Sequence, residues 1–171
     1  MQQTQDLTNP SSETCQLMNT AARAAERVAD MAKLLETLAD TLPKCSPPMW
    51  RVAQIRCGTT LKPHFMTLTR HVIPTLSGYK NNSIDQHALL MRFDLDCIEQ
   101  LHSLTDLDDL LSDVLEDRGP AKDAEALGYA LRGHFDEIRR TLAWETEVIW
   151  PLAARVLRGR DIDRILKSLN A

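Results

Sequence analysis

The stretch LGYALRGHFDEIRRTLAWETEVIWPLAARVL, residues 127–157, decides the fold. Its apolar side chains recur every three or four residues, which predicts one long amphipathic helix: Leu127, Leu131, Phe135, Ile138, Leu142, Val148, Ile149, Leu152 and Val156. Three polar residues, His134, Thr141 and Glu145, fall on the same stripe. A buried polar group costs free energy unless it is hydrogen-bonded. This helix therefore carries either a functional site or the remains of one.

The rest of the chain divides into further helices at its prolines and glycines. We expect helices at about residues 13–42, 48–76 and 83–103, a fourth from Pro120 to Gly159, and a short one at 161–169. Ser83 should cap the third helix, because Gln86 follows three residues later. Pro63 and Pro74 predict a kink and a frayed end in the second helix.

Heptad rows indicate which residues of the second and third helices face the core. On the second helix the rows are Trp50, Cys57, His64 and His71, and Ala53, Leu61, Leu68 and Thr75. On the third helix they are Ala88, Leu95, His102 and Asp109, and Ile84, Met91, Ile98 and Thr105. After Ser103 the apolar pattern weakens among acidic residues, which predicts a solvated helix end or a second short helix.

Four long amphipathic helices with short links predict an all-α, antiparallel up-down four-helix bundle. The 171 residues suit one domain. We expect a flexible tail at residues 1–12, the bundle at 13–158 and a short C-terminal helix at 159–171.

Composition excludes several classes of function. The net charge of -4 and the scattered basic residues argue against nucleic acid and membrane surfaces as partners. No apolar run reaches the roughly 20 residues of a membrane span, and no signal peptide is recognisable. Four separated cysteines without a CxxC pair predict reduced thiols and a cytoplasmic location. Because no catalytic triad, phosphate loop or pair of acids on one stripe is present, the chain is not expected to be an enzyme.

The second and fourth helices end alike, in Val72-Ile73-Pro74 and Ile149-Trp150-Pro151. LAWETEVIWPLAARVL is similar to the end of the fourth helix of the hemerythrin-like (HHE cation-binding) family, LKPHFMTLTRHVIPTL to its second helix and MRFDLDCIEQL to its third. The resemblance covers about residues 48–157. It implies the bundle fold and a pair of irons at which family members bind or sense dioxygen or nitric oxide.

Carried over residue by residue, the resemblance places only two metal ligands, His64 and Glu145. Leu68, Leu95 and Thr141 stand where the family has a Glu and two His residues, and the first helix has no His. A di-iron pair needs about five or more protein ligands. The substitutions favour a non-catalytic, hemerythrin-like bundle with a regulatory or protein-interaction role. A protein partner or a second copy would bind through a helix face.

The heptad rows also allow a metal site displaced from the family position. Seven residues span two helical turns, or about 10.5 Å. If His64, Leu95 and Thr141 share one level, then Cys57, His102 and His134 share another. A thiolate with two imidazoles suits zinc, copper or iron.

Three interpretations of the polar core residues therefore stay open. One is a metal- or haem-binding sensor or carrier with iron or zinc at His64 and Glu145. The second is the same function at Cys57, His102 and His134. The third is a packed bundle in which these side chains only satisfy one another.

Overall fold

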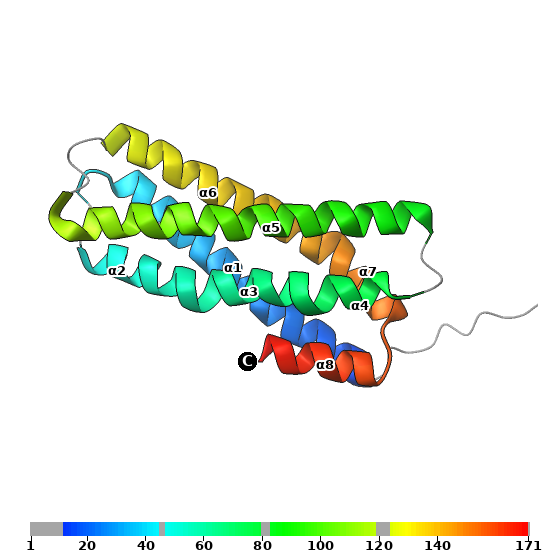
Figure 1. The fold of residues 1–171 in the computed structure, drawn as a ribbon. Coiled ribbons are helices and arrows are strands. Elements are labelled where there is room, and N and C mark those ends of the chain that lie inside the picture. The colour runs from blue at the N-terminus through cyan, green and yellow to red at the C-terminus, as the bar shows by residue number, and fades with distance from the viewer. Residues whose placement is uncertain (1–11, 45–46, 80–82, 119–123, 171) are drawn as a thin grey trace, which may run out of the picture.

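The computed structural model describes residues 12–44, 47–79, 83–118 and 124–170 (Figure 1). Within these ranges the chain is helical apart from its short links, and no strand occurs, so the expected all-α class is confirmed there. The flexible tail expected at 1–12 lies, except for Ser12, outside the described residues, as does Cys45.

Helix α1 (Ser12–Thr41) agrees with the helix expected at 13–42. Its predicted stripe is buried, with Val28, Leu35 and Leu38 at 1% exposure or less. The helix lies along α6 (Ala124–Trp144), and an ion pair between Arg139 and Glu36 joins the two at 2.6 Å. The apolar faces of both helices therefore belong to one core.

The second long rod is built from five consecutive helical segments. They are α2 (Pro47–Arg56), η1 (Cys57–Leu61), α3 (Lys62–Thr67), η2 (Leu68–Val72) and α4 (Ile73–Ser77), of which η1 and η2 are π-helical. The expected core rows are confirmed as far as Leu68, since Trp50, Cys57, Leu61 and His64 are also buried.

The expected fraying near Pro74 is wrong, because the rod continues to Ser77. The residue before each inner proline donates its backbone N–H five residues back: Lys62 to Cys57 and Ile73 to Leu68. Proline lacks an N–H and its ring clashes with the preceding turn of an α-helix. One extra residue in that turn makes room for the ring, so the helix absorbs the proline without ending.

Helix α5 (Ile84–Asp113) begins as predicted and ends later than predicted. Ser83 accepts a hydrogen bond from the Gln86 backbone while the Gln86 side chain accepts one from Ser83, which confirms the capping box. The helix runs ten residues beyond Ser103 and continues into the π-helical turn η3 (Val114–Arg118). Its apolar stripe does not weaken there, because Leu104, Leu107 and Leu111 are all buried.

The predicted inward face of α5 is wrong. Ile84, Met91, Leu95 and Ile98 are 88%, 56%, 52% and 37% exposed. The residues that face the core are instead Leu90, Phe93, Cys97, Gln100, Leu104, Leu107 and Leu111. Both sets repeat every seven residues, so periodicity alone does not distinguish the buried set from the exposed one.

The fourth rod consists of α6, the π-helical turn η4 (Glu145–Ile149) and α7 (Trp150–Val156). Gly159 follows with a φ of +47°, a conformation that favours glycine, and turns the chain back. The expected short helix is confirmed as α8 (Arg160–Leu169), which buries Ile162, Ile165 and Leu166. It packs on α1, α3 and η2, beside the end of the bundle (Figure 1).

Candidate functional site

The buried polar cluster joins α3 to the fourth rod. Nε2 of His64 lies 2.8 Å from Oε2 of Glu145, and the indole N–H of Trp150 donates to Oε1 of Glu145 at 2.6 Å. Glu145 is fully buried, and His64 and Trp150 are 7% and 2% exposed. Both carboxylate oxygens therefore have partners, as a buried carboxylate requires.

The π-helical turn explains why Glu145 meets Trp150. Residues five apart lie on different sides of an α-helix, at about 100° per residue. In η4 the wider turn brings them onto one side, and the backbone N–H of Trp150 also donates to the carbonyl oxygen of Glu145. Pro151 lies two residues after the end of η4. In the same way, Pro63 lies two residues after the end of η1, and Pro74 two residues after the end of η2. The repeated pattern of two apolar residues and a proline, Val72-Ile73-Pro74 and Ile149-Trp150-Pro151, therefore marks the end of a π-helical turn in both rods.

The remaining family ligand positions do not fit a di-iron centre. Leu68 is buried and offers no ligand atom, and Leu95 faces away from the core at 52% exposure. Thr141 is buried, but its hydroxyl donates to the backbone carbonyl of Glu137. His64 and Glu145 come together as the resemblance implies, yet they bond to each other. The residues present therefore do not suit two metal ions.

Cys97 of α5 lies at the same level of the core as the cluster. Burial raises the pKa of its thiol, and the Glu145 carboxylate raises that pKa further. Cys97 is fully buried and thus a neutral thiol beside the cluster. Sequence reasoning missed it because it placed the other face of α5 inward.

The displaced layer does not form. Cys57 lies in a hollow between η1 and α5, beside Leu104 and Asp108, and burial raises the pKa of its thiol to about 12. His102 is exposed and lines a separate groove between α5 and α6. Cys57 faces the core as expected, but the expectation that His102 meets it there is wrong, because it rested on the incorrect phase of α5.

His134 is half-buried and bonded elsewhere. Its Nδ1 lies 2.8 Å from the hydroxyl oxygen of Ser103, and burial lowers the pKa of the imidazole. Across the described ranges, no three His, Cys, Asp or Glu side chains are grouped so that they could hold a metal ion.

The groove between α5 and α6 is acidic. Its cavity volume is about 320 Å³, and its walls include Asp96, Glu99, Asp106 and Glu137 beside His102 and Arg140. Gln100, at 4% exposure, donates to the Glu137 carboxylate at 3.4 Å. Its buried amide is therefore already bonded.

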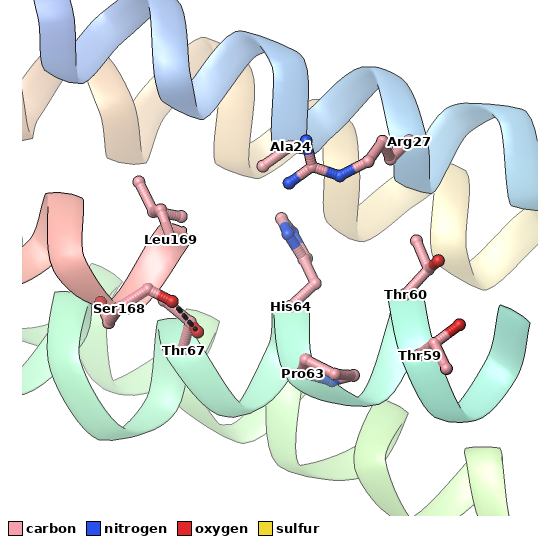
Figure 2. A pocket seen from close by; sticks show the side chains of 9 residues that line it. All are labelled: Ala24, Arg27, Thr59, Thr60, Pro63, His64, Thr67, Ser168 and Leu169. Atoms are coloured by element: carbon pink, nitrogen blue, oxygen red, sulfur yellow. Dashed lines mark hydrogen bonds between the residues drawn. The ribbon is translucent and has the colours of Figure 1, made fainter. Parts of the chain in front are cut away.

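A second cavity, of about 140 Å³, opens above His64 (Figure 2). Helix α1 contributes Ala24 and Arg27, the second rod contributes His64 and three threonines, and α8 contributes Ser168 and Leu169. Figure 2 shows the His64 ring rising from α3 toward the Arg27 side chain. His64 thus connects the cavity with the buried Glu145.

No protein-family model, curated protein or solved structure matches the chain. The resemblance to the hemerythrin-like family therefore rests on the quoted motifs alone. Among the described residues, no helix combines the length and the apolar character that crossing a membrane requires.

The sequence analysis did not indicate two residues of these sites, Trp150 beside Glu145 and Arg27 beside the cavity above His64. Trp150 is buried and its indole N–H donates to Glu145. Its spacing of five residues from Glu145, just before Pro151, is the signal that could have indicated this contact. Arg27 gives no such signal, because the cavity beside it is assembled from three distant segments.

Proposed function

We propose that this chain is a non-catalytic, hemerythrin-like four-helix bundle that acts through protein contacts. The order of the rods supports the bundle topology. In Figure 1, α1, the α2–α4 rod, α5 and the α6–α7 rod run in alternating directions along the molecule. These alternating directions support the up-down arrangement that the hemerythrin-like resemblance implies.

The polar cluster supports a structural rather than a chemical role for the former ligand positions. The His64–Glu145–Trp150 hydrogen bonds satisfy each carboxylate oxygen without a metal ion. Such a cluster fixes how α3 and η4 pack, because each polar group has one partner position that satisfies it. The bundle can therefore keep its shape after most family ligands have been replaced.

The observation that carries the proposal is the exposed apolar stripe of α5. Ile84, Met91, Leu95 and Ile98 lie at the spacing of the d and a positions of a coiled coil and are between 37% and 88% exposed. A sustained apolar row on the outside of a helix is the pattern that a partner helix buries.

Charge favours a second copy of this chain as the partner. Arg92 and Glu99 are seven residues apart and flank Leu95 on the same side of α5. When two copies of α5 pair antiparallel around Leu95 and Ile98, Arg92 of each copy lies beside Glu99 of the other. In the described residues Arg92 pairs only with the half-buried Asp96, at 2.9 Å, and its own side chain is 64% exposed, so it can also reach a second copy. Flanking charge pairs of this kind select orientation in coiled coils.

Sedimentation velocity tests the proposal on the full chain. We expect a wild-type dimer and a monomeric Leu95→Glu variant, because a carboxylate would then lie at the centre of the apolar contact. Ile55→Glu is the matched control: Ile55 is 57% exposed but belongs to α2, so this variant should remain dimeric.

A charge exchange tests the antiparallel register. Arg92→Glu should weaken the dimer, and Arg92→Glu combined with Glu99→Arg should restore it. A wild-type protein that is monomeric at every concentration would overturn the second copy as the partner. Elemental analysis after growth with iron or zinc tests the alternative sensor: one metal per chain would favour it over the proposal.

A further inference from the structure

We infer that the cavity above His64 is a binding site for a small oxyanion, a carboxylate or a phosphate. Its volume, about 140 Å³, is below the roughly 300 Å³ at which pockets for drug-sized ligands begin. The ligand must therefore be small, on the scale of acetate or inorganic phosphate. This site is independent of the α5 stripe and of the dimer.

The charge of the cavity wall favours an anion. Among the described residues no Asp or Glu lines the cavity, whereas Arg27 stands at its rim. Within the described parts of the chain, the Arg27 guanidinium has neither an ion pair nor a hydrogen bond. By contrast, the groove between α5 and α6 has four carboxylates in its wall. An arginine without a carboxylate partner, facing a cavity, offers a planar set of N–H donors for an oxyanion.

The hydroxyl groups of the cavity are not equivalent. Thr59, Thr67 and Ser168 each donate to a backbone carbonyl, and a hydroxyl has only one hydrogen to give. Thr60 makes no hydrogen bond to the residues that the structure describes. The Thr60 hydroxyl is therefore the one in this wall that can donate to a ligand.

His64 lies at the base of the cavity (Figure 2). Its Nε2 is held by Glu145, while its Nδ1 has no partner among the described residues. A carboxylate is an acceptor only, so an ionised Glu145 takes the Nε2 hydrogen and fixes the ring. With Nε2–H given to Glu145, Nδ1 is the ring nitrogen left for a ligand, and it accepts a hydrogen bond from the O–H of a hydrogen phosphate. Arg27, Thr60 and His64 then approach one volume from α1, η1 and α3 (Figure 2).

Titration with inorganic phosphate and with acetate, at constant ionic strength in chloride, tests this site. NMR signals of the Thr60 amide and the His64 ring report on occupancy. We expect a saturable shift of both signals with at least one of the two anions. The stronger of the two identifies the chemical class of the ligand.

Two pairs of variants separate the site from general charge effects. Arg27→Gln should weaken binding about tenfold, the loss of one charge-assisted contact. Arg23→Gln removes the same charge one turn earlier on α1, outside the cavity wall, and should bind as the wild type does. Thr60→Val should weaken binding, whereas Thr59→Val should not, because the Thr59 hydroxyl already donates to Ile55.

Two results would overturn the inference. One is the absence of a saturable shift with either anion in the wild-type protein. The other is an equal loss of affinity in Arg27→Gln and Arg23→Gln, which would reduce the effect to nonspecific attraction. Both arginines are exposed, so neither substitution removes core packing.

Discussion

At the residue scale, the buried Glu145 is held through both of its carboxylate oxygens. It is fully buried and accepts hydrogen bonds from two other elements of the core, α3 and α7. Its selection from the sequence as a polar residue on an apolar stripe is confirmed by this burial. Its direct bond to His64 needed the structure, because two ligand-type residues can equally share a metal ion.

Removing one partner of this pair should destabilise the protein more than removing both. His64→Leu leaves a buried carboxyl group without its partner, at a cost of about 3–5 kcal/mol in the free energy of unfolding. In His64→Leu with Glu145→Leu the orphaned group is the Trp150 indole N–H, at a cost of about 1–3 kcal/mol. Urea unfolding followed by circular dichroism measures both variants.

Exposed His87 provides the control for this comparison. His87→Leu should change the free energy of unfolding by less than about 0.5 kcal/mol. A double variant as unstable as the sum of His64→Leu and Glu145→Leu would show that the two side chains contribute independently.

At the element scale, the π-helical turns explain where sequence reasoning succeeded and where it failed. The helices, their approximate limits and the capping box at Ser83 followed from local patterns. Pro63 and Pro74 were expected to kink or fray their helix, but these two prolines and Pro151 each follow a π-helical turn that lets the helix continue. A local pattern does not show this, because the extra residue is indistinguishable from its neighbours in type.

The predicted inward face of α5 was wrong for a different reason. Two apolar rows of equal period compete on this helix, and only one continues to its end. The buried row reaches Leu111, whereas the exposed row becomes polar at Thr105 and Asp109. Following both rows over all 30 residues of α5 would have favoured the correct face. The predicted layer of Cys57, His102 and His134 depended on the wrong face of α5, so it does not form.

Two glycines should respond to alanine in opposite directions. Gly159 has a φ of +47°, so Gly159→Ala should lower the free energy of unfolding by about 1–3 kcal/mol through backbone strain. Gly133 is exposed within α6, with no neighbouring atom within 4 Å of an added Cβ. Gly133→Ala should raise the free energy of unfolding by about 0.5–1 kcal/mol. Thermal unfolding of both variants tests the pair, and stabilisation by Gly159→Ala would contradict the strained turn.

At the scale of the whole molecule, two of the hollows differ in the charge of their walls. The cavity by α1, α3 and α8 contains Arg27 and no carboxylate, whereas the α5–α6 groove contains four carboxylates. The net charge of -4 did not predict this division, because it averages over both. A chain-wide charge therefore argued against nucleic acid as a partner but gave no information on small anions.

Helix α8 should be the first part of the described structure to open. It has ten residues and is held by Ile162, Ile165 and Leu166, with Tyr79 donating to Asp161 at 2.8 Å. Hydrogen exchange should be faster at its amides than at those of residues 131–142 in α6, because local opening costs less than global unfolding. Equal protection of both helices would contradict this order.

Helix α8 borders the cavity above His64. Its last turn forms one wall of the cavity above His64, and the Thr67 hydroxyl fastens that wall by donating to the carbonyl oxygen of Ser168. Local opening of α8 would remove this wall, so we expect the opening equilibrium of α8 to set how readily a ligand reaches His64.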